Sequence, residues 1–225
     1  MDVLREARII VFDNDGTLVP SHLVANPAIQ GGFSLFCRRH AIVAEAPTDQ
    51  RIRDLTGLSG EAFYRALLPE GAKHHSAALR EFCLDHEVAA MLDRAEFYPG
   101  VRDLLVALRA RGARLAVATN GGARYVGAVA TRLGYDALFD RVYHIEMEGF
   151  AHKGEMALRA LRELAPGAGV FVGDRRADRD AASHARMAFV GCLYGYGSDA
   201  ELEGADVLVE SPKALAEALL GEAHS

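Results

Sequence analysis

Two aspartates separated by one residue, Asp13 and Asp15, are the side chains of this sequence best placed to do chemistry. They directly follow the apolar run Ile9–Phe12, whose β-branched content predicts a buried strand. Paired carboxylates just past a buried strand are costly unless a cation or a proton offsets their charge. Gly16 permits a sharp turn, and Thr17 adds a hydroxyl and a backbone N–H. The segment therefore predicts a cation or proton-transfer site, although Asp-Gly is also a common turn.

A second pair of acids, Asp174 and Asp178, follows another apolar run that ends at Gly173. Their spacing of four residues predicts that both lie on the same face of a helix start. Together with Asp13 and Asp15 they form an all-oxygen set of candidate metal ligands, which suits a hard cation such as Mg²⁺. Taken alone, Asp174 is equally explained as a helix cap and Asp178 as a first-turn charge that favours the helix dipole.

The two acids of the first pair suit different tasks. A carboxylate with an ordinary pKa is ionised at neutral pH and can attack phosphorus, and Asp13, nearest the strand, is the candidate nucleophile. Asp15 is the candidate acid and base, because neighbouring negative charge favours its protonated form. The transferring phosphoryl group needs N–H donors and positive charge around its oxygens. The candidates for this binding are Thr119, Asn120, Gly121 and Lys153.

Lys153 is one of three lysines in a chain that otherwise prefers arginine. A compact ammonium beside Asp13 would reduce the repulsion between nucleophile and phosphate. The alternative is an exposed lysine at a helix start, where the helix dipole disfavours positive charge.

Short apolar strands alternate with helices of about ten residues from Val101 to Leu219, which predicts a parallel sheet covered on both faces. The predicted fold is therefore α/β, a doubly wound parallel sheet with a Rossmann-like core. Right-handed crossovers bring the carboxyl ends of all strands to one edge, so Asp13, Thr119 and Asp174 should converge there.

A stretch of different character interrupts this pattern and reads mostly as helix and turn. We predict an inserted all-helical cap at residues 20–93, with the α/β core formed by residues 1–19 and 94–225. Within the cap, Arg53 and Ser59 are candidate substrate-binding residues, although helix capping and solvated charge explain them equally well. Residues Gly71–His75 are expected to form a loop in which adjacent histidines are simply exposed.

The composition of the chain limits the classes of protein to which it can belong. The chain has 225 residues, of which 50% are hydrophobic, enough for one large domain or a core with an insertion. A net charge of −6 argues against a general nucleic-acid binder. The three cysteines are scattered and odd in number, which predicts reduced thiols in a cytoplasmic protein. No signal peptide or membrane span is expected, and we expect a monomer or a homodimer.

Four segments in the same order resemble the haloacid dehalogenase-like hydrolase superfamily: Asp13–Leu18, Ala118–Asn120, Lys153, and Gly173-Asp174 with Asp178. The resemblance implies a helical-cap enzyme with the first aspartate as nucleophile and the second as acid and base. It also implies that the second aspartate offers its backbone carbonyl to Mg²⁺, that Thr119 and Lys153 bind phosphate, and that the late aspartates hold the metal.

Looser segments in the cap and near Tyr98–Val101 and Gly195–Ser198 resemble phosphoglycolate phosphatases. The sequence departs from the family where Asn14 stands in place of an apolar residue, Gly154 in place of proline, and Arg175 in place of serine. The expected activity is Mg²⁺-dependent hydrolysis of a small phosphorylated metabolite through an aspartyl phosphate.

Three alternatives stay open. A sugar phosphomutase or a phosphonate hydrolase of the same family would share the core residues, and the latter needs a cap lysine, for which Lys73 is the candidate. A Mg²⁺-binding regulatory module that has lost turnover is the non-enzymatic alternative. A dehalogenase is disfavoured because it has no need of the second aspartate, Asp15.

Overall fold

The computed structural model describes residues 4, 6–56, 58, 60–164 and 167–221. The chain divides into two compact units. The first holds the described residues up to Pro20, Glu96–Asn120, and those from Leu133 onward; the second holds Ser21–Ala95 and Gly121–Arg132. The helical unit thus draws on two stretches of chain, whereas the division predicted from sequence was a single insertion at residues 20–93.

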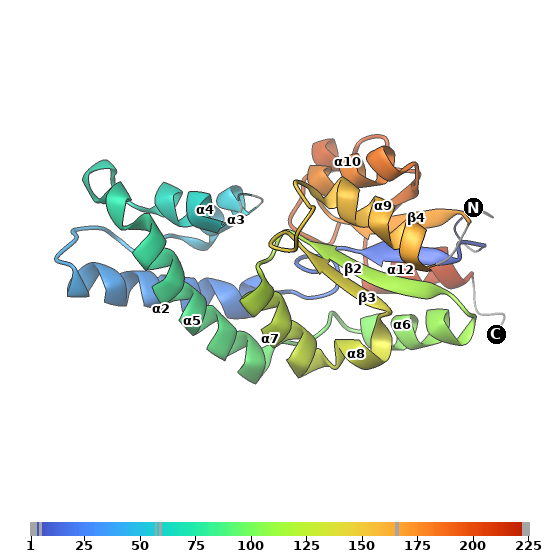
Figure 1. The fold of residues 1–225 in the computed structure, drawn as a ribbon, viewed down its shortest axis with the longest axis horizontal. Coiled ribbons are helices and arrows are strands. Elements are labelled where there is room, and N and C mark those ends of the chain that lie inside the picture. Colours follow the sequence, from blue (N-terminus) through green and yellow to red (C-terminus); the bar gives the residue numbers. More distant parts are fainter. Residues whose placement is uncertain (1–3, 5, 57, 59, 165–166, 222–225) are drawn as a thin grey trace. The chain divides into compact units, whose positions relative to one another are not determined.

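The first unit is built on a six-stranded, all-parallel sheet with the order β3-β2-β1-β4-β5-β6 (Figure 1). The strands are β1 (Ile9–Phe12), β2 (Arg114–Thr119), β3 (Arg141–His144), β4 (Gly169–Gly173), β5 (Ala188–Cys192) and β6 (Val207–Val209). The predicted doubly wound α/β fold is confirmed. The strand order reverses between β1 and β4, and ligands of such sheets bind at this point, beyond the carboxyl ends of the strands.

Helices cover both faces of this sheet (Figure 1). They are α6 (Val101–Ala110), α8 (Tyr135–Leu138), α9 (Lys153–Leu164), α10 (Arg176–Ala185), α11 (Asp199–Leu202) and α12 (Pro212–Leu220). The pair α9 and α10 packs on one face, and the pair α6 and α12 packs on the other. All four residues of β1 are consequently buried, which explains why this strand reads as a continuous apolar run.

Local sequence signals fix several of these bounds. Helices α6 (Val101–Ala110) and α7 (Ala123–Leu133) have the length of about ten residues that the alternating pattern predicts. Helix α12 begins after Ser211, whose hydroxyl accepts the Ala214 N–H at 3.1 Å, with Pro212 in the first turn, a combination typical of a helix start. Strand β1 has the ends that the apolar run Ile9–Phe12 predicts.

Among the described residues of the second unit, the regular elements are all helices, and residues 42–48 connect two of them without regular structure. Besides most of α7, its elements are α2 (His22–Arg39), α3 (Asp49–Leu55), α4 (Gly60–Leu67), the 3₁₀ helix η1 (Glu70–His75) and α5 (Ser76–Arg94). Helices α2 and α5 pack along each other around an apolar core that includes Phe33, Phe36, Leu79 and Cys83.

The expected loop at Gly71–His75 is wrong: these residues lie in the 3₁₀ helix η1. Pro69 precedes η1 and its carbonyl accepts the Ala72 N–H at 2.9 Å, while the Ala72 side chain is buried. His74 is exposed as expected, but His75 is partly buried and its ring contacts that of His40. A single buried alanine is too weak a signal to predict this helix from sequence.

The three cysteines, Cys37, Cys83 and Cys192, are free thiols in buried positions, as their scattered spacing predicts. Among the described residues, none of the helices combines the length and the apolar character that a transmembrane span requires.

Candidate active site

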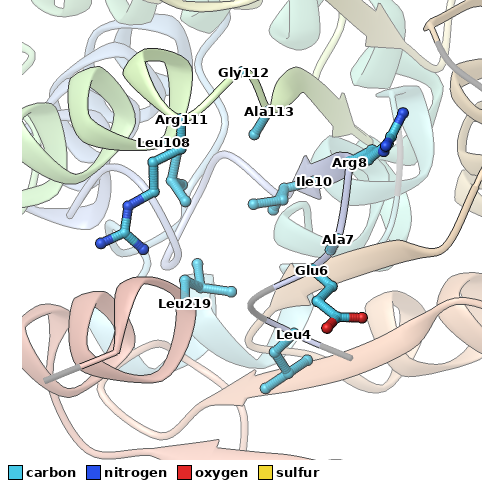
Figure 2. Close-up of a pocket in the computed structure, with 10 residues that line it drawn as sticks. All are labelled: Leu4, Glu6, Ala7, Arg8, Ile10, Leu108, Arg111, Gly112, Ala113 and Leu219. Atoms are coloured by element: carbon cyan, nitrogen blue, oxygen red, sulfur yellow. The ribbon is translucent and has the colours of Figure 1, made fainter. Parts of the chain in front are cut away.

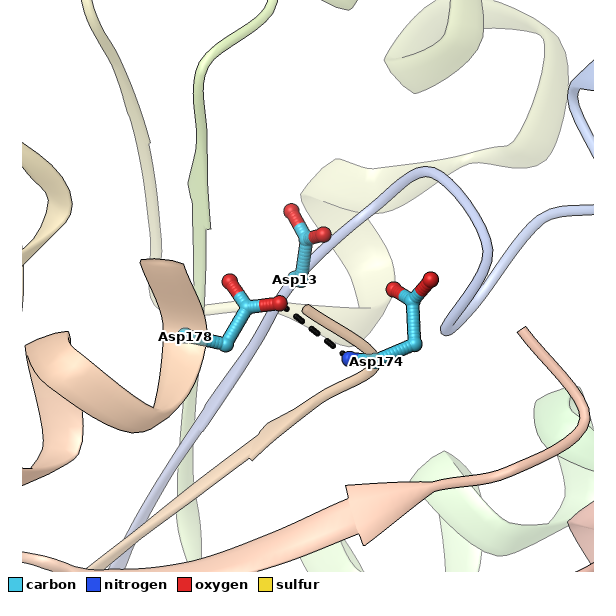
Figure 3. A group of neighbouring side chains, drawn as sticks. All are labelled: Asp13, Asp174 and Asp178. Carbon is cyan, nitrogen blue, oxygen red and sulfur yellow. Dashed lines mark hydrogen bonds between the residues drawn. The ribbon is translucent and has the colours of Figure 1, made fainter. Parts of the chain in front are cut away.

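Three carboxylates meet at the switch point of the sheet. Asp13 directly follows β1, Asp174 directly follows β4, and Asp178 lies in the first turn of α10 (Figure 3). Each is at most 4% exposed, and one oxygen of each lies within 4.8 Å of the others. The sheet brings them together because β4 pairs with β1, so that the Asp13 N–H donates to the Val172 carbonyl at 2.9 Å.

Lys153, the first residue of α9, neutralises part of this charge. Its Nζ lies 2.7 Å from Oδ1 of Asp13 and 2.7 Å from Oδ1 of Asp178, and the side chain is 6% exposed. Burial alone lowers the pKa of Lys153, but the Asp13 and Asp178 carboxylates outweigh burial and hold this pKa above the ordinary lysine value. The alternative of an exposed lysine is therefore wrong.

Asp178 organises the loop around it. Besides binding Lys153, its Oδ2 accepts the backbone N–H groups of Asp174 at 3.1 Å and Arg175 at 2.9 Å. The prediction that Asp174 and Asp178 share a helix face is wrong, since α10 begins at Arg176 and Asp174 precedes it. The two carboxylates converge because the Asp178 side chain turns back to accept the backbone N–H groups of the loop before α10. The same side chain therefore caps the helix and belongs to the acidic cluster.

Asp174 is held by two donors. The Thr17 hydroxyl donates to Oδ1 at 2.9 Å, and the Tyr196 N–H donates to Oδ2 at 2.7 Å. Burial and the neighbouring Asp178 nevertheless raise the pKa of Asp174 to about 7. This carboxylate therefore sits in a site that disfavours its charge as long as no cation is added.

The cluster as a whole carries excess negative charge. It holds three carboxylates but one ammonium, so full ionisation leaves two uncompensated negative charges. Burial raises the pKa of Asp13 well above its ordinary value, and Asp178 raises it further, although Lys153 opposes both. A divalent cation with a preference for oxygen ligands fits this donor set and charge.

Asp15 has a different environment from Asp13. It lies in the turn after β1, is partly exposed, and is not one of the three clustered carboxylates. The turn closes when the Gly16 N–H donates to the Val19 carbonyl at 2.9 Å, with Gly16 at φ +88°. A side chain at Gly16 would also collide with the Asp174 carboxylate. The two aspartates are thus separated into one buried and one accessible group.

The other predicted residues are dispersed. Thr119 ends β2 and is 1% exposed, and Asn120 follows it in a partly exposed position. Gly121 and Arg53 belong to the helical unit, where the Arg53 Nη2 donates to Gln50 Oε1 at 2.9 Å. Ser59 lies outside the described residues. The structure therefore brings Asp13, Lys153, Asp174 and Asp178 into contact, and the roles of all these residues remain predictions.

Sequence reasoning did not assign the residues that support Asp174. These are Thr17 and Tyr196, together with Gly195 and Gly197, at which an added Cβ would overlap Asp174 atoms. Two glycines flanking an aromatic residue after β5 were a usable signal, because such spacing indicates a close backbone approach. Arg175, which stands in place of the family's serine, is paired with Glu201 through Nε and Oε2 at 3.0 Å.

A cavity of about 300 Å³ lies elsewhere in the first unit, against the residues that precede and begin β1 (Figure 2). Its apolar lining includes Ile10, Leu108 and Leu219, and none of the predicted site residues lines it. Asp13 follows the opposite, carboxyl end of β1, so this cavity is separate from the acidic cluster.

The family model for haloacid dehalogenase-like hydrolases matches residues 7–186, which include the whole acidic cluster. The chain belongs to the haloacid dehalogenase-like hydrolase family. This assignment confirms the resemblance found in the sequence and identifies the chain as an enzyme.

Several similar proteins are named as phosphatases or nucleotidases. A phosphoglycolate phosphatase from Pseudomonas putida is 28% identical over 218 residues, covering 92% of this chain and 78% of its own. A 5'-nucleotidase from Pseudomonas aeruginosa is 34% identical and covers 86% of each chain. The structure of CbbY from Rhodobacter sphaeroides in complex with phosphate has a TM-score of 0.73 at 25% identity, covering 91% of this chain and 94% of that one. The predicted assignment to the phosphatases of this family is confirmed.

Proposed function

We propose that this chain is a Mg²⁺-dependent hydrolase of small phosphomonoesters that acts through an aspartyl phosphate on Asp13. The observation that carries the proposal is the buried cluster in which Lys153 binds both Asp13 and Asp178. Lys153 offsets the charge of the nucleophile and leaves an excess of negative charge that a divalent cation would balance.

In the first step an oxygen of Asp13 attacks phosphorus, the bond from phosphorus to the ester oxygen breaks, and Asp15 gives its proton to the leaving alkoxide. In the second step Asp15 takes a proton from water, the water oxygen attacks phosphorus, and the bond to Asp13 breaks to release inorganic phosphate. The partial exposure of Asp15 suits a group that must reach both the leaving alcohol and the water. Thr119, Asn120, Gly121 and Lys153 would bind the phosphoryl oxygens.

The residues that would hold Mg²⁺ are Asp13, Asp174, Asp178 and, through its backbone carbonyl, Asp15. Asp178 also holds the loop of Asp174 in place. The bound cation would stabilise the negative charge on the phosphoryl oxygens. The raised pKa of Asp174 supports this proposal, since the site favours a compensating positive charge.

Two substrate classes follow from the relatives. Phosphoglycolate is the first candidate because several relatives are phosphoglycolate phosphatases. A nucleoside monophosphate is the second, because the 5'-nucleotidase is 34% identical to this chain. Arg53 and Ser59 are our candidates for substrate selection within the helical unit. A cytoplasmic location is part of the proposal, since the three cysteines are free thiols.

The phosphonate alternative depends on Lys73. Its Nζ is paired with Glu70 Oε2 at 2.5 Å within η1, so Lys73 would have to leave this pair to form a Schiff base. A sugar phosphomutase would use the same acidic cluster, and it would differ from the proposed hydrolase by forming an isomeric sugar phosphate in place of inorganic phosphate.

The test is phosphate release from phosphoglycolate, nucleoside monophosphates, sugar phosphates, pyrophosphate and a phosphonate, with Mg²⁺ or with EDTA. We expect turnover that EDTA abolishes and Mg²⁺ restores. Asp13→Asn should remove at least about 99% of activity, because an amide is a poor nucleophile. Asp180→Asn is the matched control, since the Asp180 side chain is 62% exposed and pairs with Arg179 at 3.3 Å.

Several results would contradict the proposal. Full turnover in EDTA would refute the metal role, and more than a few per cent residual activity in Asp13→Asn would refute the nucleophile. A folded protein that binds Mg²⁺ but releases no phosphate from any substrate would favour the regulatory module. Conversion of one sugar phosphate to its isomer would favour the phosphomutase.

A further inference from the structure

The residue between the two aspartates, Asn14, has a buried polar partner. Asn14 is 1% exposed, and its Oδ1 accepts a hydrogen bond from the Tyr135 hydroxyl at 2.6 Å. Tyr135 begins α8, lies 121 positions later in the chain, and is fully buried. The Asn14 Nδ2 has no hydrogen-bond partner among the described residues. Burying two polar side chains costs free energy, so we expect this pair to have a role beyond packing.

Asn14 is also the hub of the turn that carries Asp15. Its backbone carbonyl accepts the N–H groups of Leu18 at 2.9 Å and Val19 at 3.0 Å, which folds the turn back onto Asn14. The side chain then connects this turn to α8 through Tyr135. Any shift of Asn14 moves Asp15, because the two residues share a peptide bond.

The hydroxyl of Tyr135 is a rigid anchor. Its ring stacks on Phe97, with centroids 5.9 Å apart and an interplanar angle of 14°, and packs against Phe139 at 4.9 Å. These aromatic contacts leave the tyrosine little freedom, so the hydroxyl defines a fixed point to which the turn is bonded.

We propose that the hydrogen bond between Asn14 and Tyr135 positions the carboxyl group of Asp15 for proton transfer to the leaving alcohol. Tyr135 is then a positioning residue, which acts through Asn14 and does not touch the substrate. This inference rests on the proposed function, in which Asp15 is the acid. It also gives Asn14, a departure from the apolar residue usual in the family, a defined task.

Substrates with different leaving groups distinguish a misplaced acid from general disruption of the active site. An alkoxide cannot leave without a proton, whereas p-nitrophenolate leaves without one, so the acid matters for the first ester and little for the second. The measurement is kcat/KM, which reports the steps up to alcohol release, for p-nitrophenyl phosphate and for the alkyl phosphate that the substrate panel ranks first. General disruption of the cluster would lower both values equally.

In Tyr135→Phe we expect kcat/KM for the alkyl phosphate to fall roughly tenfold to a hundredfold relative to the value for p-nitrophenyl phosphate. Tyr143→Phe is the matched control, because it also removes a buried tyrosine hydroxyl, which donates to Glu163 at 3.1 Å. The control should leave the ratio of the two values unchanged.

The double variant Asn14→Leu with Tyr135→Phe removes both polar partners. We expect it to recover the melting temperature lost in the single variant, because no buried group is left unsatisfied, but not the ratio of the two kcat/KM values. Recovery of the ratio together with stability would overturn the inference, as would an equal fall on both substrates in Tyr135→Phe. If Tyr135→Phe does not fold, the ratio of the two kcat/KM values is measured in the double variant and compared with that of wild type.

Failure of this inference is distinct from failure of the proposed function. Wild-type turnover of p-nitrophenyl phosphate that Asp13→Asn abolishes supports the proposed function whatever the ratio does. An unchanged ratio in an active Tyr135→Phe variant overturns the positioning role alone.

Discussion

Lys153→Met removes the one ammonium from the acidic cluster while keeping the length of the side chain. Each of its two contacts, at 2.7 Å, is worth about 6 kcal/mol by Coulomb's law at an effective dielectric constant of about 20. The desolvation of the buried charges offsets much of this sum of about 12 kcal/mol. The net cost of removing one partner of a buried ion pair is about 3–5 kcal/mol, a large share of the roughly 5–15 kcal/mol that stabilises a domain.

The free energy of unfolding that Lys153→Met loses should depend on pH. Burial raises the pKa of Asp13 and brings that of Asp174 to about 7, and removal of the ammonium raises both further. A carboxyl whose pKa is higher in the folded than in the unfolded state loses stabilising free energy as pH rises through the folded pKa. The difference between Lys153→Met and wild type should therefore be smaller near pH 5, where Asp13 and Asp174 are protonated, than near pH 8.

The assay is urea unfolding at pH 5 and pH 8 in EDTA, repeated at pH 8 with Mg²⁺. Lys213→Met is the matched control, since the Lys213 side chain is 88% exposed and lies 3.9 Å from Glu217. We expect Mg²⁺ to recover part of the loss in Lys153→Met, because a cation that binds only the folded state stabilises it. Equal stability of the variant and wild type at pH 8, or the same loss at both pH values, would refute the electrostatic argument.

Two further substitutions test contacts outside the cluster. Asp140→Asn should lower the free energy of unfolding by about 1–2 kcal/mol at pH 7, since Asp140 accepts the Leu115 N–H at 2.9 Å and Arg114 Nη1 at 2.8 Å. Burial raises the pKa of Asp140, but these hydrogen bonds outweigh burial and hold the pKa below its ordinary value. The loss should therefore shrink as pH falls below about 4 and through the folded pKa, and a loss in urea unfolding that is as large at pH 3 as at pH 7 would contradict this. In the helical unit, Tyr64→Phe should cost about 1–2 kcal/mol by breaking the buried hydrogen bond to Glu87, and an unchanged melting temperature would refute this role.

The sequence by itself determined the features that depend on short stretches of chain. The apolar run Ile9–Phe12 followed by two aspartates predicts a buried strand with chemistry at its carboxyl end, because burial and turn formation are local properties. Ser211 followed by Pro212 marks a helix start for the same reason. Alternating strands and helices determined the parallel sheet, since such a pattern can bury its apolar faces in few ways.

Partnerships between distant residues were decided by the tertiary structure. Thr17 binds Asp174 across 157 positions, Lys153 joins Asp13 to Asp178, and Asn14 meets Tyr135 across 121 positions. These contacts exist because β4 lies beside β1 at the switch point and α8 packs close to the turn after β1. Strand order and the packing of helices result from burying the whole apolar surface at once. The sequence of a short segment therefore does not specify them.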